Sequence, residues 1–290
     1  MGRVFSSEQI RNHDYPEPED FENAKQVFED RINLGIGRGL LSGGCIYGSV
    51  AMGIQNRRSD FDTVILLTKE GPEERKAARR TLARITKETN GRIPINDSIA
   101  EPPDYLESGF HDLDYSFTKS LTGPRRLVFG NDPANYIVPN GIPSRSVLQS
   151  YITHKNRRLS AAYGAQDPLG VETGGLQRQL ELPVAIARKT LDAISVLPGY
   201  QNLEFHSSDK ANIIELGRKL FAQFQLTETF DDILTLNSVY DQHLQKLINQ
   251  EISPQQYDDF ILKMHAHLPK SIAWVKAVGA KILPLFNEAA

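Results

Sequence analysis

Two apolar periodicities alternate in the first half of the chain. The apolar residues of segment 21–34 recur at helical spacing, which predicts a helix with an inner face formed by Phe21, Ala24, Phe28 and Ile32. The apolar runs "LLSGGCIYGS" at 40–49 and "DFDTVILLT" at 60–68 predict strands, with a turn and a short helix between them. Segment 72–90 begins with Pro and two Glu residues and is followed by Gly91, which is typical of a helix.

The pattern continues to about residue 133. The segment "RIPINDSIA" at 92–100 predicts a further strand, and "RRLVFGNDP" at 125–133 predicts a strand that completes this part of the fold. Between them, "LDYSFTKSL" at 113–121 predicts a helix. Strands and helices therefore mix throughout this first part.

Beyond this point the chain changes character. The segment from Pro133 to Pro143 is rich in Pro, Asn and Gly, which predicts a loop and a domain boundary. Helical periodicity then dominates, in the segments 144–163, 175–197, 208–224, 228–249 and 254–288, the last with an expected break near Pro269. The expected fold class is α+β, with a mixed-sheet domain at 1–140 and an all-helical domain at 141–290.

Composition narrows the class of protein. The chain has 290 residues, which favours two domains, and its 40% hydrophobic and 24% charged residues are typical of a globular protein. No apolar run approaches the roughly 20 residues that cross a bilayer. The single cysteine, Cys45, excludes an internal disulfide and fits a reducing compartment, so we expect a cytoplasmic protein and no membrane partner. The net charge of −3 gives no general attraction to nucleic acid.

Asp60 and Asp62 are the most informative residues, because they stand at the head of the strongest apolar run. On a strand, side chains two residues apart point to the same face, which puts these carboxylates about 6–7 Å apart. Two such charges repel unless a cation lies between them. Mg²⁺ prefers hard oxygen ligands and is commonly held by one or two carboxylates together with substrate phosphates. The pair therefore predicts a magnesium site.

Gly48 and Ser49 form the second half of the expected site, directly after the first predicted strand. A Gly lets the backbone approach a ligand closely, and amides at the start of a short helix, with a Ser hydroxyl, can hold phosphate. Ten residues separate Ser49 from Asp60. A phosphate cradle and metal ligands on one short segment indicate a site for a metal-bound nucleotide.

A Gly-Ser pair followed after ten residues by Asp-any-Asp on a strand resembles the signature of the DNA polymerase beta-like nucleotidyltransferase superfamily. The smaller bacterial members, such as aminoglycoside and minimal nucleotidyltransferases, are the most similar, because they also follow the catalytic domain with helices. The resemblance implies a third carboxylate on a later strand. Asp97 fits by order and is preferred, with Asp112 and Asp114 as rivals. A two-metal site on Asp60, Asp62 and Asp97 would then stabilise the attacking oxygen and the leaving pyrophosphate.

Basic side chains are expected near the triphosphate. Arg57 and Arg58 directly precede the aspartates, and either could meet phosphate or simply water. The first helix after the boundary carries Lys155, Arg157 and Arg158. Related enzymes often supply a Lys there, so Lys155, with Arg58, is assigned to nucleotide binding.

The expected function is transfer of a nucleoside monophosphate from a triphosphate such as ATP to an acceptor hydroxyl, with release of pyrophosphate. A small molecule of the aminoglycoside type or a protein side chain is the favoured acceptor, and the acidic composition disfavours RNA. Two alternatives stay open. One is an enzyme that modifies RNA ends, and the other is a non-catalytic or toxin-antitoxin-type interaction protein that retains the fold.

Overall fold

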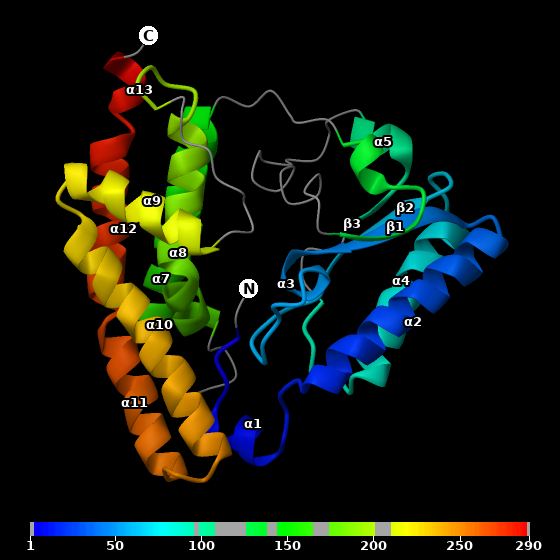
Figure 1. The fold of residues 1–290 in the computed structure, drawn as a ribbon, viewed down its shortest axis with the longest axis horizontal. Helices are drawn as coiled ribbons and strands as arrows, with labels where there is room; N and C mark the ends of the chain where they lie inside the picture. Colours follow the sequence, from blue (N-terminus) through cyan, green and yellow to red (C-terminus); the bar gives the residue numbers. More distant parts are fainter. Residues whose placement is uncertain are drawn as a thin grey trace. The chain divides into compact units, whose positions relative to one another are not determined.

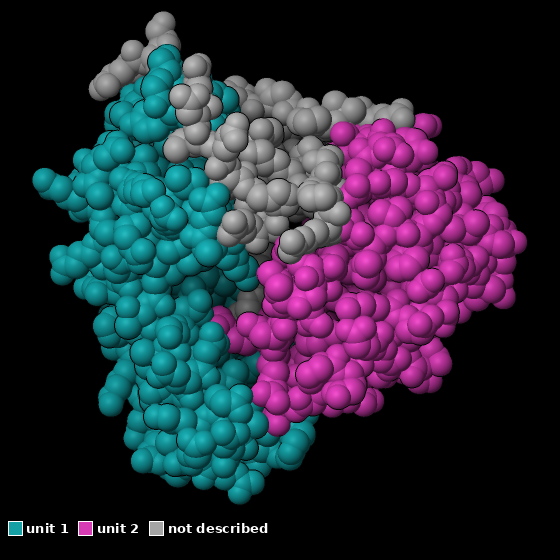
Figure 2. Space-filling model, in the orientation of Figure 1, with its two compact units in different colours: residues 1–14, 142–290 teal, residues 15–141 magenta. Residues whose placement is uncertain are grey.

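The computed structural model describes residues 3–95, 99–107, 126–137, 144–164, 174–200 and 210–288. The chain forms two compact units (Figures 1 and 2). The sheet unit consists of residues Tyr15–Gly141, and the helical unit consists of Met1–Asp14 together with Ile142–Ala290. The sequence predicts a first domain that includes residues 1–14, whereas the structure groups them with the helical unit.

The sheet unit is built on four strands in the order β3-β2-β1-β4. β1 pairs antiparallel with both β2 and β4, and β2 pairs in parallel with β3, so the sheet is mixed. In chain order its described elements are α2 (Pro18–Gly37), β1 (Leu41–Tyr47), α3 (Gly48–Ala51), β2 (Asp62–Leu67), α4 (Pro72–Glu88), β3 (Ile99–Glu101), α5 (Pro103–Glu107), β4 (Leu127–Gly130) and a 3-10 helix (Pro133–Asn135).

Two apolar clusters cover the two faces of this sheet. Helices α2 and α4 lie on one face (Figure 1), where the predicted inner face of α2 is completely buried against Ile65 and its neighbours. On the other face Cys45, Val64 and Leu66 pack with Leu106 of α5. Burial on both sides explains why β2 is a continuous apolar run, as the sequence predicted.

One predicted strand is much shorter than expected. Segment 92–100 was expected to be extended throughout, but β3 begins only at Ile99, and residues 92–95 are not in a strand. Arg92 instead bonds to Thr89 at the end of α4, through its amide at 2.9 Å. The predicted helix at 113–121 lies outside the described residues.

The helical unit carries the remaining helices. They are α1 (Ser7–Arg11), α7 (Ser144–Tyr163), α8 (Gly174–Ile194), α9 (Lys210–Gln223), α10 (Thr227–Ile248), α11 (Pro254–Ala266), α12 (Leu268–Ile282) and α13 (Leu285–Glu288). The predicted break near Pro269 is confirmed, since α11 ends at Ala266 and α12 begins at Leu268. Trp274 is buried, as expected of a core residue, and its indole donates a hydrogen bond to the Leu226 carbonyl at 3.1 Å.

Residues 3–14 join the helical unit because two buried tyrosines hold the backbone of Phe5. The Tyr240 hydroxyl accepts a hydrogen bond from the Phe5 amide at 3.0 Å, and the Tyr257 hydroxyl donates to the Phe5 carbonyl at 3.0 Å. The Phe5 side chain is fully buried. The helical unit thus buries the Phe5 side chain and also provides hydrogen-bond partners for both of its backbone polar groups.

The described part of the chain therefore combines a four-stranded mixed sheet with many helices, in agreement with the expected α+β class. None of the helices within the described ranges is both long and apolar enough to cross a bilayer.

Candidate functional site

The turn between β1 and β2 brings Gly48 and Asp62 together. Tyr47 pairs with Asp62 across the two strands, so Gly48 follows β1 at the point where β2 begins. Gly48 has a φ of 72°, a conformation that favours glycine. A Cβ atom on Gly48 would collide with the Asp62 carboxylate. Gly48 and Asp62, from opposite ends of the motif, are therefore in direct contact range, and a larger residue at position 48 would have to displace this carboxylate.

Asp60 lies just before β2 and not within it. β2 begins at Asp62, so the expectation that both aspartates lie on the strand is wrong for Asp60. The physical reason is the hydrogen bond of the next residue, because the Phe61 amide donates to the Pro94 carbonyl at 2.9 Å instead of pairing with β1. Phe61 is fully buried and packs edge-on against Phe28, with ring centroids 6.1 Å apart.

Both carboxylates stand on rigid backbone. Asp60 is only 2% exposed, and its neighbour Phe61 anchors the segment in the core below. Asp62 belongs to the sheet, and strand alternation places it on the same face as Val64. The proposed third ligand, Asp97, and its rivals Asp112 and Asp114 lie outside the described residues. Within the described ranges no three or more His, Cys, Asp or Glu residues form a group that could hold a metal.

A tight turn fixes the segment that leads to Asp60. The Ser59 amide donates to the Asn56 carbonyl at 2.9 Å, and the Asn56 amide donates to the Ser59 hydroxyl at 3.0 Å. The amide of Arg58 donates to the Asn56 side chain at 3.0 Å. Arg58 is 6% exposed, so this predicted nucleotide-binding residue is buried beside Asp60 in the chain.

Arg57, whose role the sequence left open, reaches the start of the sheet unit. Its guanidinium lies 3.0 Å from the Glu17 carboxylate and stacks over the Tyr15 ring at 5.3 Å. Tyr15 is the first residue of the sheet unit, and Glu17 caps α2. Arg57 therefore ties the Asp60 segment to the base of α2.

Lys155, the other predicted nucleotide-binding residue, belongs to α7 of the helical unit. It is 4% exposed, and its ammonium lies 5.1 Å from the Tyr151 ring centroid, which Lys189 also approaches. Burial lowers the pKa of Lys155, the Glu181 carboxylate opposes that change, and Arg178, Lys189 and Arg158 reinforce it. The sheet unit thus contains five of the predicted site residues, which are Gly48, Ser49, Arg58, Asp60 and Asp62. Lys155 belongs to the helical unit.

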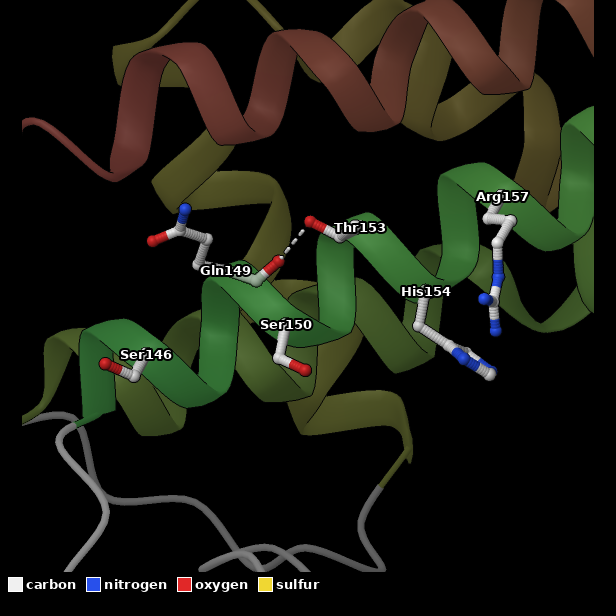
Figure 3. Close-up of a pocket in the computed structure, with 6 residues that line it drawn as sticks. All are labelled: Ser146, Gln149, Ser150, Thr153, His154 and Arg157. Atoms are coloured by element: carbon white, nitrogen blue, oxygen red, sulfur yellow. Dashed lines mark hydrogen bonds between the residues drawn. The ribbon is translucent and has the colours of Figure 1, made fainter.

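An open polar hollow, which the motifs do not predict, lies along α7 (Figure 3). It has a volume of about 490 Å³ and is lined by Ser146, Gln149, Ser150, Thr153, His154 and Arg157. The Thr153 hydroxyl donates to the Gln149 carbonyl at 2.8 Å. The spacing of these residues follows one helix face, and this polar stripe was the signal available in the sequence.

Cys45 is excluded as a nucleophile. It is fully buried on β1, within the strand predicted at 40–49, and burial raises the pKa of its thiol to about 12. At neutral pH the thiol is therefore protonated and enclosed.

Comparisons with known proteins give no assignment. The chain matches no protein-family model, no curated protein and no solved structure.

Proposed function

We propose that the protein is a Mg²⁺-dependent nucleotidyltransferase that transfers a nucleoside monophosphate from a triphosphate such as ATP to an acceptor hydroxyl. The observation that carries the proposal is the contact between Gly48 and the Asp62 carboxylate. The resemblance to the polymerase beta-like superfamily rests on this same pair, together with Ser49 and Asp60. Gly48 adopts a left-handed backbone conformation, and the Asp62 carboxylate occupies the space that a side chain at this position would take.

The donor set fits magnesium. Asp60 and Asp62 supply hard carboxylate oxygens from rigid backbone, and Asp97 is the proposed third ligand. Magnesium bound there would neutralise charge on the triphosphate and on the leaving pyrophosphate. The protein itself would position the phosphates with Gly48, Ser49 and Arg58. In the reaction the acceptor oxygen forms a bond to the α-phosphorus, the bond to pyrophosphate breaks, and a carboxylate takes the acceptor proton.

Lys155 adds a second support for an anionic substrate. A buried ammonium is costly unless an opposite charge compensates it. Among the groups that shift its pKa, one is a carboxylate and three are cations. A triphosphate would add to the negative charge that Glu181 supplies. The proposed architecture is thus a catalytic sheet domain followed by a helical domain that contributes to substrate binding.

The decisive experiment measures ATP binding by calorimetry with and without Mg²⁺. Asp60→Asn with Asp62→Asn is expected to weaken Mg²⁺-dependent binding by more than about 100-fold, since even outer residues of a metal site contribute about 10- to 100-fold. The matched control is Asp30→Asn with Asp104→Asn, which neutralises two exposed aspartates of the same unit. Binding that ignores Mg²⁺, or equal effects of both double variants, contradicts the proposal and favours a non-catalytic interaction protein.

A second measurement identifies the acceptor class. Incubation of α-labelled triphosphates with the protein and cell-lysate fractions shows whether label enters small molecules, protein or RNA. We expect a Mg²⁺-dependent product that the Asp60 and Asp62 variant does not form.

A further inference from the structure

Helices α2 and α4 carry opposite charges on their exposed sides. The exposed charged residues of α2 are all acidic, and we call them the acidic stripe: Glu19, Glu22 and Asp30. On α4 the exposed Glu73 lies near the start, and the other exposed charged residues form a basic stripe: Lys76, Arg79, Arg80, Arg84 and Lys87. Both helices cover the same face of the sheet (Figure 1), so the two stripes lie on neighbouring helices.

Most of the basic stripe is not compensated within the described part of the chain. Three of its cations form no ion pair with any described residue: Arg79, Arg80 and Lys87. The other two pair with glutamates of α4 itself, Lys76 with Glu73 at 3.4 Å and Arg84 with Glu88 at 2.5 Å. Exposed pairs of this kind contribute little stability. The basic stripe is therefore available to another molecule.

The two stripes are aligned along the helix axes. Asn23 lies near the start of α2, and its side-chain amide donates a hydrogen bond to the carbonyl of Glu88, the last residue of α4, at 3.3 Å. The helices therefore run antiparallel, with these two residues at the same level. Because each residue rises about 1.5 Å, Asp30, seven residues after Asn23, is level with Thr81, seven residues before Glu88. Glu22 is level with the last turn of α4.

We propose that the face formed by α2 and α4 is an interface between two copies of this chain in solution. A two-fold interface uses the same patch on both copies, so the patch must be complementary to itself. A two-fold axis on this surface, parallel to the helices and between them, places α2 of each copy over α4 of the other and keeps every residue at its own level. Asp30 of one copy then faces Arg80 and Arg84 of the other. Glu22 faces Lys87.

The acidic stripe favours a second copy over a polyanion as the occupant of this face. A nucleic acid would be attracted by α4 and repelled by the acidic stripe beside it, whereas a second copy matches both stripes. The exposed side chains of both helices are mostly polar, so we expect a weak dimer whose partner choice is set by charge. The inference does not depend on the proposed function.

Sedimentation velocity of the full chain tests this interface. We expect a reversible dimer whose dissociation constant rises about tenfold or more between about 0.05 M and about 0.5 M salt, because salt screens exposed charges. A chain that stays monomeric at low salt and at concentrations up to about 1 mM overturns the proposal.

Charge reversal on each stripe locates the interface. One variant carries Arg80→Glu with Arg84→Glu, and the other carries Glu22→Lys with Asp30→Lys. Each variant alone brings like charges together across the two-fold axis, so its dimer should weaken about tenfold or more. In an equimolar mixture each altered stripe meets the opposite charge again, and a heterodimer should form about as tightly as the natural dimer. A mixture that does not associate overturns the assignment to this face.

Two controls make this result specific. Lys246→Glu with Lys263→Glu reverses two exposed cations of the helical unit and should leave dimerisation unchanged. Equal weakening by this control would show that net charge governs association, and would overturn the proposal. Slow labelling of the buried Cys45 thiol confirms that each α2 or α4 variant keeps the sheet unit folded.

A polyanion is tested directly with polyuridylate. A natural chain that stays monomeric but binds polyuridylate, and loses this binding in the Arg80→Glu, Arg84→Glu variant, would assign the basic stripe to nucleic acid. That result overturns the proposed dimer. No measurement in this series uses ATP or Mg²⁺, so failure of the dimer would not affect the nucleotidyltransferase proposal.

Discussion

The most deeply buried charges of the sheet unit and of the helical unit differ in sign. Among the described residues, the least exposed charged side chain of the sheet unit is Asp60, at 2%, and that of the helical unit is Lys155, at 4%. Burying either group costs free energy unless an opposite charge compensates it, so buried charges often mark functional sites. The proposed function would use the first of these charges, because Mg²⁺ binding needs a carboxylate such as that of Asp60.

The chain contains one reporter for each unit. Its single cysteine, Cys45, lies on β1 of the sheet unit, and its single tryptophan, Trp274, lies in the core of the helical unit. The Cys45 thiol reacts with a thiol reagent only when the sheet unit opens, because the thiol is buried and protonated. Trp274 fluorescence follows the helical unit. Each substitution can therefore be assigned to the unit that it changes.

The largest effect is expected from Gly48→Ala. The new methyl group would occupy the space of the Asp62 carboxylate and would also strain a residue at positive φ. Such strain costs about 1–3 kcal/mol, and displacement of Asp62 should weaken Mg²⁺-dependent ATP binding by about tenfold or more. Labelling of Cys45 should accelerate, while the Trp274 unfolding transition stays unchanged.

Gly53→Ala is the control for this substitution. Gly53 also has a positive φ, of 69°, but the position of its Cβ is open space. It should reproduce the strain without the loss of ATP binding. If both variants lose ATP binding equally, strain and not the carboxylate contact is responsible.

Local periodicity made much of both units predictable from the sequence. The buried face of α2 could be predicted from the spacing of the apolar residues from Phe21 to Ile32. The break after α11 could be predicted from Pro269 alone. The docking of residues 3–14 was not predictable, because the hydrogen bonds of Phe5 come from Tyr240 and Tyr257, 235 and 252 positions away.

The candidate site was predictable in composition but not in detail. Gly48 and Asp62 follow from motif spacing. The position of Asp60 before the strand depends on the Pro94 carbonyl, and the role of Arg57 depends on Glu17. Neither contact produces a periodic pattern in the sequence. The polar residues that line the hollow along α7 recur at helical spacing, so this stripe could have been found in the sequence.

A smaller effect is expected from Lys155→Met in the helical unit, which should raise the stability of this unit and lower the affinity for ATP. Replacing a buried cation by an apolar side chain of similar length should stabilise this unit by about 1 kcal/mol or more. ATP affinity should fall about tenfold, because a charge-assisted contact is lost. The exposed Lys276→Met, on α12, should change neither quantity. A destabilised Lys155→Met would show that the ammonium is compensated within the protein.

The stabilisation by Lys155→Met should depend on pH. The folded protein holds the pKa of Lys155 below its ordinary value of 10.5, so the unfolded chain binds more protons between the lowered pKa and 10.5. The stability of the natural protein therefore rises with pH through this window, relative to the variant. Unfolding followed by Trp274 fluorescence should show the largest advantage of Lys155→Met below the lowered pKa and a shrinking advantage as the pH approaches 10.5.

The smallest effect is expected from the ion pair between Arg57 and Glu17, and it separates positioning from stability. The two side chains are 32% and 36% exposed, so losing the pair should cost at most about 1 kcal/mol. A double-mutant cycle compares Arg57→Met, Glu17→Gln and the variant that carries both changes. The affinity for Mn²⁺, measured in the presence of ATP, should fall by a few-fold in each single variant. It should fall little further in the double variant. Arg218→Met removes a similarly exposed pair with Asp231 from the helical unit and should leave Mn²⁺ affinity unchanged. A fall in metal affinity in both single variants that Arg218→Met does not show would support a link between this ion pair and the Asp60 segment. Equal affinities would show that the base of α2 does not position Asp60.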